Sequence, residues 1–169
     1  LVDSVELENL SNIYLYKYPQ LNITILRPCN IAGPGVRNTF SLLLSEKRAP
    51  VLWGFSPLMQ FIHIDDMRDA IELAFEKNKP GVYNVAPNDY IGFQDAIKAA
   101  GAVPIPIPSI PPKLTESISR FLKWKSFPPY LINYFKYPVI IDGSLFVKTF
   151  NFKHKKTLSD IFNYYKSLK

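Results

Sequence analysis

The pattern of apolar and polar positions divides the chain into helices and strands. Residues 3–18 carry apolar side chains at helical spacing, and Pro19 follows, so we predict a helix that ends there. A short apolar run at 23–26 comes next and is bounded by turn residues, which is typical of a buried parallel strand. The helix-then-strand order indicates an α/β protein.

The clearest amphipathic pattern lies in the middle of the chain. Its apolar residues recur at positions i, i+3, i+4, i+7 and i+8: Met67, Ala70, Ile71, Ala74 and Phe75. A stripe of this kind faces a protein core. We therefore predict that Met67, Ile71, Ala74 and Phe75 are buried against the strand at 23–26. We also expect Asp65 and Asp66 to cap this helix and to offset its dipole.

The remaining elements follow from shorter signals. We predict strands at 50–53, 58–64, 82–86 and 139–141, and helices at 38–44 and 93–100. Thr157 and Asp160 form an acidic capping box for a final helix, which is expected to pack through Leu158, Ile161, Phe162, Tyr165 and Leu168. The proline-rich stretch 103–112 must be extended, because proline lacks the amide proton, and can serve only as an edge strand or a connector.

Composition narrows the class of protein. The chain has 169 residues, of which 47% are hydrophobic and 20% charged, as in a globular protein of one domain. No apolar run approaches the ~20 residues of a membrane span, and residues 1–6 do not resemble a signal peptide. The single cysteine, Cys29, excludes a disulfide framework and favours a cytoplasmic location.

Charge is distributed unevenly along the chain. The net charge is +6, and residues 111–169 carry eleven Lys/Arg against three Asp/Glu. This basic part is either a solvated face or a surface for an anionic partner. We do not expect nucleic acid as the partner, although aromatic and basic residues interleave at 111–137, as they do in some membrane-surface and nucleic-acid modules.

The chain has two histidines that could take part in chemistry. His63 lies in an apolar stretch without the spacing of a catalytic triad or a metal site, so a structural role is favoured. His154 lies among three lysines and is expected to be exposed.

Four motifs resemble a known family. They are Thr24-Ile-Leu-Arg-Pro-Cys-Asn-Ile-Ala-Gly-Pro34, Gln60-Phe-Ile-His-Ile-Asp-Asp66, Gly81-Val-Tyr-Asn-Val-Ala86, and Ile141-Asp142 with Lys156-Thr157-Leu158. Their order and spacing resemble the carboxyl-terminal half of an extended short-chain dehydrogenase/reductase of the NAD-dependent epimerase/dehydratase family. The resemblance implies the last part of a Rossmann-type parallel sheet in residues 1–87 and a smaller mixed α/β substrate-binding lobe in residues 88–169.

The resemblance also implies a site and its ligands. Pro28 and Cys29 match positions that bind the cofactor, which would be NAD or NADP in the full-length parent. Asn30, Asn38 and Gln60 match positions at the substrate, although Asn30 could instead stabilise the turn and Asn38 could cap a helix. The substrate would be a small molecule such as a nucleotide-sugar. Met59 and Gln60 stand where sugar-nucleotide members commonly carry an arginine, which favours a less anionic substrate, although Arg120, Lys123 or Lys125 could replace that charge. No metal ligand set is present. A homodimer is compatible with the sequence.

Two features of the family are missing from the chain. The glycine-rich turn G-x-x-G-x-x-G, which holds a pyrophosphate, does not occur. The tyrosine and lysine of the family's Y-x-x-x-K motif are also missing, because the lysine would align with Ser4 or Val5. We therefore expect the isolated chain to be inactive and to have no measurable affinity for NAD(P). The alternative is a non-catalytic relative that binds a nucleotide or a protein.

The basic, aromatic stretch from Leu114 to Tyr137 yields one further expectation. It should fold over the carboxyl end of the sheet near Asn30, since hydride transfer needs a site from which water is excluded. Trp124 and Tyr130 would then lie on the same side of the sheet as Asn30. The alternative is that these aromatic residues close a second small core.

Overall fold

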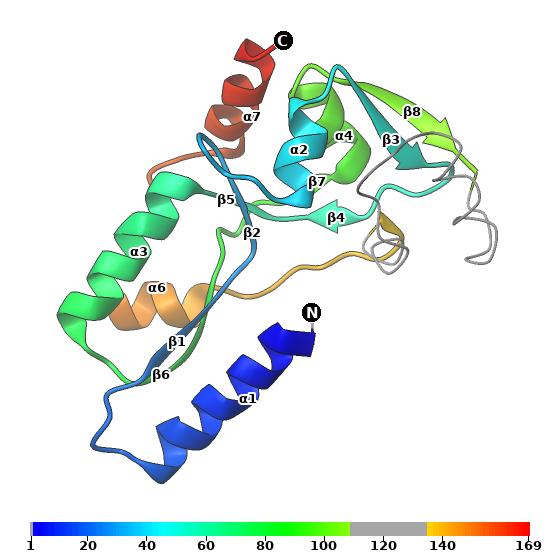
Figure 1. The fold of residues 1–169 in the computed structure, drawn as a ribbon. Helices are drawn as coiled ribbons and strands as arrows, with labels where there is room; N and C mark the ends of the chain where they lie inside the picture. Colours follow the sequence, from blue (N-terminus) through cyan, green and yellow to red (C-terminus); the bar gives the residue numbers. More distant parts are fainter. Residues whose placement is uncertain (1, 109–134) are drawn as a thin grey trace.

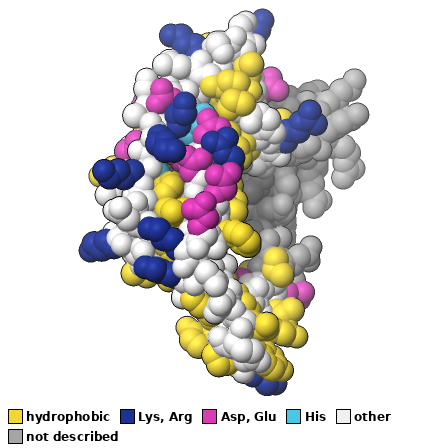
Figure 2. All heavy atoms as spheres, turned by 90° about the vertical axis from the view of Figure 1, so that its left-hand side faces the viewer, with side chains coloured by type: hydrophobic (Ala, Val, Ile, Leu, Met, Phe, Trp, Pro, Cys, Tyr) yellow, Lys and Arg dark blue, Asp and Glu magenta, His cyan; other side chains and the backbone are white. Residues whose placement is uncertain are grey.

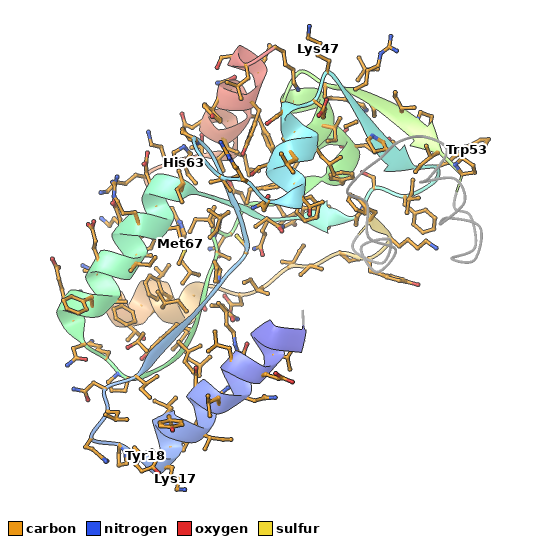
Figure 3. All side chains as sticks on the ribbon, in the orientation of Figure 1. Lys17, Tyr18, Lys47, Trp53, His63 and Met67 are labelled. Atoms are coloured by element: carbon orange, nitrogen blue, oxygen red, sulfur yellow. The ribbon has the colours of Figure 1, made fainter. Side chains whose placement is uncertain are left out.

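The structure is a computed structural model that describes residues 2–108 and 135–169 (Figure 1). Its first part is a parallel strand pair with helices around it. β1 (Thr24–Pro28) pairs with β6 (Gly81–Val85) in parallel, with Pro28 opposite Val85. α3 (Ile64–Lys77) and α6 (Ser144–Phe150) pack on one face of this pair through a core of Ile62, Met67, Ala70, Ala74, Tyr83, Val85, Phe146, Phe150 and Phe152. Figure 3 shows Met67 pointing from α3 toward the two strands.

α1 (Val2–Lys17) lies on the opposite face of β1. Arg27 of β1 forms an ion pair with Glu8 of α1, whereas the neighbouring Leu26 faces α3. Successive side chains of a strand point to opposite faces, so this alternation places the two helices on opposite sides of the sheet. The arrangement is that of an α/β protein with parallel strands, as the sequence predicts.

The second part of the molecule is a mixed α/β unit. β3 (Arg48–Leu52) pairs in parallel with β8 (Val103–Ile107), and β4 (Leu58–Met59) pairs in antiparallel fashion with β7 (Ile91–Gly92). α2 (Thr39–Ser45), α4 (Phe93–Ala99) and α7 (Leu158–Ser167) pack against them. The core includes Leu44, Ile97 and Ile161, and the rings of Phe40, Phe93 and Phe135 contact one another.

A third parallel pair joins these two parts. β2 (Asn30–Ala32) follows β1 after one residue and pairs with β5 (Phe61–His63), which leads directly into α3. Each of the two hydrophobic cores draws residues from both sides of position 87. The boundary expected there stays a prediction. None of the described helices has the length and apolar content that a membrane crossing requires.

Several local predictions are confirmed. Asn38 caps α2, because its side chain accepts a hydrogen bond from the Ser41 amide. Thr157 and Asp160 form the capping box of α7. Within the proline-rich stretch 103–112, residues 103–107 form an edge strand, since β8 pairs only with β3 among the described residues, and residues 109–112 lie outside the described part of the chain.

The prediction for the buried face of α3 is wrong in half of its residues. Met67 and Ala74 are buried, but Ile71 is 53% exposed and Phe75 is 86% exposed. The strands and α6 cover the side of α3 that carries Met67, Ala70 and Ala74, and they do not reach Ile71 and Phe75. Helical spacing predicted an apolar stripe, and only part of it has a partner in the described residues.

Five smaller expectations also need correction. The single strand expected at 58–64 is two strands of different sheets, β4 and β5, of which β5 ends at His63. This histidine, rather than Asp65 or Asp66, caps α3. The segment 139–141 forms one isolated bridge, between Val139 and Met59, instead of a strand. Leu168 is exposed at the end of α7. His154, expected on the surface, has a side chain that is only 18% exposed.

Candidate functional site

The candidate site lies where β1 and β6 end. The amide of Cys29 donates a hydrogen bond to the carbonyl of Val85, at 3.1 Å, and thereby extends the parallel pairing by one residue. Pro28 is exposed at this edge, while Cys29 and Asn30 are half-buried. Open α/β sheets bind their ligands beyond the carboxyl ends of the strands. The structure thus brings Pro28, Cys29 and Asn30 together at the edge where the sequence predicts a ligand.

Cys29 has an unreactive thiol. Burial raises its pKa to about 12, so the side chain is protonated at neutral pH. Because the thiolate is the nucleophilic form, Cys29 acts here as a small, neutral and largely apolar group.

Asn30 and Gln60 meet at the joint between β2 and β5. The side-chain amide of Asn30 donates to the backbone carbonyl of Gln60 at 2.9 Å. This bond orients the Asn30 side chain, and its Nδ2 atom donates to a partner within the protein. The Oδ1 atom of Asn30 is then the part of the side chain that can accept a hydrogen bond from a ligand.

The side chain of Gln60 is buried and ties together three segments that are distant in sequence. Its Nε2 atom donates to the carbonyls of Pro87, at 2.9 Å, and Ile141, at 3.1 Å. Its Oε1 atom accepts from the amide of Ile141 at 2.8 Å. Gln60 thereby fixes the segment around Ile141 beside the end of β6.

Asn38 is the N-cap residue of α2. Its Oδ1 atom accepts from the Ser41 amide, and its Nδ2 atom donates to the carbonyl of Ile31, both at 2.8 Å. Both polar atoms of the side chain are bonded within the protein. Asn38 therefore ties the start of α2 to β2.

The segment 142–144 crosses the end of β6. Asn84 donates from its side chain to the carbonyl of Asp142 at 3.2 Å. The Asp142 carboxylate accepts from the amide and the hydroxyl of Ser144, and these two bonds lower its pKa. A Cβ atom on Gly143 would overlap the backbone of Ala86, so only glycine allows this close approach. Sequence reasoning missed Gly143; its signal is an isolated glycine beside Asp142.

Asp66 was expected to cap a helix, but it binds a remote loop instead. The carboxylate is buried and accepts hydrogen bonds from the amides of Lys155, at 3.1 and 3.2 Å, and Lys156, at 3.1 Å. His154 lies beside it, with Nδ1 3.8 Å from Asp66 Oδ2. Burial lowers the pKa of His154, so this ring is neutral near pH 7. The cluster anchors the chain between α6 and α7.

His63 has a structural role, as favoured from the sequence. Its ring is buried, and Nδ1 accepts from the amide of Asp65 at 3.1 Å. The turn that follows β2 packs against this ring, since a Cβ on Gly33 would lie 3.2 Å from His63 Nε2. In the part of the chain that the structure describes, no group of three or more His, Cys, Asp and Glu residues could hold a metal ion.

The segment expected to cover the site falls mostly outside the described residues. Trp124 and Tyr130 lie outside the described residues, as do most residues of the stretch from Leu114 to Tyr137. At the end of this stretch, Phe135 is buried against Phe40 and Phe93.

Comparison with known proteins supports the motif-based resemblance. Residues 5–86 match the model of the NAD dependent epimerase/dehydratase family. Uncharacterized proteins of Mycobacterium bovis and Mycobacterium tuberculosis are 25% identical to the chain over 163 residues, which are 96% of this chain and 43% of each relative. The chain thus spans somewhat less than half the length of the curated relatives it matches.

Solved structures show the same fold. UDP-glucuronic acid 4-epimerase from Bacillus cereus, in complex with UDP-glucuronic acid and NAD, superimposes with a TM-score of 0.65 and 23% identity over 96% of this chain and 50% of that one. dTDP-glucose 4,6-dehydratase from Bacillus anthracis, in complex with NAD, superimposes with a TM-score of 0.66 and 16% identity, covering 96% of this chain and 52% of that one. RMD from Pseudomonas aeruginosa, complexed with NADPH, superimposes with a TM-score of 0.65 and 11% identity, covering 94% of this chain and 51% of that one. The Rossmann-like α/β fold and the resemblance to this family are confirmed.

Proposed function

Taking the match of residues 5–86 to the NAD dependent epimerase/dehydratase family as the premise, we propose that this chain is the substrate-binding half of an NAD(P)-dependent epimerase, dehydratase or related reductase. One observation carries the proposal: the parallel pair β1–β6 ends in a run of neutral and amide side chains, Pro28, Cys29 and Asn30. That edge is the usual place of the ligand in an open α/β sheet.

The proposed cofactor is NAD or NADP, and this chain would contact only its nicotinamide end. Pro28 and Cys29 present a neutral surface, since the thiol stays protonated, and a planar ring can pack against such a surface. When bound, the nicotinamide supplies the acceptor or donor of a hydride for a carbinol carbon of the substrate. The pyrophosphate would be held elsewhere in the parent protein, because the chain has no G-x-x-G-x-x-G turn.

Asn30 is the residue that we propose contacts the substrate most directly. With Nδ2 bonded to Gln60, its Oδ1 atom is available to accept a hydrogen bond from a substrate hydroxyl. Gln60 and Asn38 complete the proposed substrate site by shaping it, because their own polar atoms are bonded to Pro87, Ile141, Ile31 and Ser41. In this proposal residues 1–87 form the cofactor side and residues 88–169 the substrate lobe.

A nucleotide-sugar is the first substrate class to test. The Bacillus cereus epimerase was solved with UDP-glucuronic acid, and this supports the class. Met59 and Gln60 carry no charge at the position where an arginine would bind a phosphate, and this favours a less anionic substrate. Measuring activity on a panel of nucleotide-sugars and on the corresponding free sugars would distinguish a nucleotide-sugar from a less anionic substrate. The single cysteine supports a cytoplasmic protein, and a homodimer stays a prediction.

Calorimetry tests the proposal. The 169-residue chain should show no measurable NAD or NADP binding, whereas the longest natural polypeptide that contains it should bind one of the two. Low-micromolar binding by the 169-residue chain alone would contradict the assignment of the pyrophosphate site to the rest of the protein.

A second measurement tests the role of Asn30. In the same long polypeptide, Asn30→Ala should raise the KM of the substrate several-fold and change cofactor affinity little. Asn163→Ala, at an exposed position of α7, is the matched control and should change neither. Equal behaviour of the two variants would remove Asn30 from the substrate site.

A non-catalytic relative is the second candidate. It is favoured by one observation, that Ser4 or Val5 stands where the family carries its catalytic lysine. Such a protein would keep the fold and bind a nucleotide or a protein partner. Reading the residues that precede Leu1 distinguishes the two candidates: a Y-x-x-x-K pattern supports the enzyme, and its absence supports the binding protein.

A further inference from the structure

The carboxyl end of β6 is held in place through its backbone carbonyl groups. The carbonyl of Val85 accepts a hydrogen bond from the amide of Cys29 at 3.1 Å. The carbonyl of Pro87 accepts one from Nε2 of Gln60 at 2.9 Å. Amides do not titrate near neutral pH, so these two bonds are independent of pH. Ala86, between them, is only 2% exposed, and its carbonyl therefore also needs a partner within the protein.

His154 supplies that partner from the chain between α6 and α7. The backbone of Ala86 hydrogen-bonds the imidazole ring and favours its protonated form, which identifies the carbonyl as the group involved. The Nδ1 atom of the ring is buried and has no hydrogen-bond partner within residues 2–108 and 135–169. The donor to Ala86 is therefore Nε2, and the neutral ring carries its proton there.

The other side of the ring faces α3. Nδ1 lies 3.8 Å from Oδ2 of Asp66, which is too far for a hydrogen bond. The same carboxylate accepts the amides of Lys155 and Lys156, so it fixes the backbone segment that carries the ring. The ring also packs edge-on against Phe152, with the two centroids 5.0 Å apart. His154 thus bridges the start of α3 and the end of β6.

Charged groups act on this ring from several elements. Asp66 acts from α3 and Asp89 from the loop after β6, and both carboxylates favour the protonated form. On its own segment the neighbouring residues are Lys153 and Lys155, which are exposed. Figure 2 shows only a little histidine surface, within a cluster of acidic and basic side chains. Burial outweighs the two carboxylates and lowers the pKa of His154, so the bridge forms with a neutral ring.

We propose that His154 is a positioning residue of the candidate site: its neutral ring fixes the end of β6 against Cys29, and a proton on the ring releases that end. The inference rests on the proposed function only in that a ligand binds at this edge of the sheet.

The burial of the ring explains the release. When the end of β6 opens, the ring reaches water and binds a proton with the ordinary pKa of about 6.5, whereas the closed state binds it less readily. The closed state is therefore fully favoured above that pH and loses its advantage below it. Each pH unit below about 6.5 makes the open state roughly tenfold more populated, until the closed state also binds the proton.

Hydrogen exchange measures this opening without any ligand, so a failure of the inference is distinct from a failure of the proposed function. The longest natural polypeptide that contains the chain is exchanged at about pH 7.5 and about pH 5.5, on either side of the ordinary pKa, and deuterium is located at single amides by mass spectrometry. The Cys29 amide reports its bond to Val85. The Trp53 amide, bonded to the carbonyl of Ile107 at 2.8 Å, is the control.

The expected result is a local loss of protection in acid. After correction for the intrinsic exchange rate, protection of the Cys29 amide should be about tenfold lower at the lower pH, because that pH lies one unit below the ordinary pKa of the ring. Protection of the Trp53 amide should not change.

Two variants separate positioning from a general effect of acid. His154→Gln keeps an amide donor for Ala86 but does not titrate, so the protection of Cys29 should be equal at the two pH values and close to the natural protein's at the higher one. His154→Phe keeps an aromatic ring without a donor, so the protection should be equally low at both.

The pH dependence decides the outcome. Equal protection of Cys29 at the two pH values in the natural protein overturns the proposal, and so does a tenfold fall that persists in His154→Gln. Loss of protection at Trp53 as well would show that a variant has unfolded as a whole, and the comparison of the natural protein at the two pH values then decides alone.

Discussion

The hydroxyl group of Tyr165 provides the sharpest test of how the carboxyl-terminal helix supports the site. It accepts a hydrogen bond from the amide of Gly33 at 2.9 Å and donates one to the hydroxyl of Ser41 at 2.9 Å. Tyr165 and Ser41 are each 1% exposed. The substitution Tyr165→Phe removes this one oxygen and leaves the ring in place.

The magnitude follows from the groups left behind. The buried amide of Gly33 loses its partner, and an unsatisfied buried donor costs about 1–3 kcal/mol. Ser41 loses a donor but can still rotate its own hydroxyl, which adds little. We expect Tyr165→Phe to lower the free energy of unfolding by about 2 kcal/mol. The loss should be larger than that of an ordinary surface substitution, which is usually within about 0.5 kcal/mol.

Urea denaturation followed by circular dichroism measures this difference. Tyr164→Phe, at the next position of α7, is the matched control, because it removes the same atom from a side chain that is only half-buried. A double-mutant cycle with Ser41→Ala should give a coupling energy of about 0.5–1.5 kcal/mol, the usual size for one neutral hydrogen bond. If Tyr165→Phe and Tyr164→Phe cost the same, or if the coupling is zero, the reasoning fails.

Three further outcomes are expected from the same structure. Gly143→Ala should destabilise the protein by about 1–3 kcal/mol in urea denaturation, because its methyl group would meet backbone atoms at the end of β6; a neutral effect would contradict the close approach. Ile71→Ala and Phe75→Ala should each cost less than about 0.5 kcal/mol in the 169-residue chain, whereas Met67→Ala should cost about 2–5 kcal/mol; equal losses would place all three side chains in one core. The pKa of His154 is lowered by burial, so the unfolded state binds its proton more readily. The stability due to the neutral ring is therefore complete above the ordinary pKa of about 6.5 and is lost as the pH falls below it. His154→Asn should flatten the slope of unfolding free energy between about pH 5 and 7, and an unchanged slope would show that other groups cause it.

Local sequence signals determined many of the elements. The helix before Pro19, the strand after it, the Asn38 cap and the capping box of Thr157 and Asp160 all form as predicted. Each of them depends on residues within a few positions of one another, so the chain needs no tertiary partner to specify it. The motif around Pro28, Cys29 and Asn30 likewise predicted which strand end would carry the candidate site.

Long-range packing decided the rest. Helical spacing predicts an apolar stripe on α3, but the position of β6 and α6 determines that Met67 is buried and Phe75 is not. The position of Asp66 at the start of a helical pattern predicts that it caps the helix. Its carboxylate instead accepts hydrogen bonds from amides 89 and 90 residues further along the chain. His154 reads as exposed among lysines, and that same contact buries it. Such partners meet only when the chain is folded, because nothing in the local sequence records which distant backbone will supply the hydrogen bond.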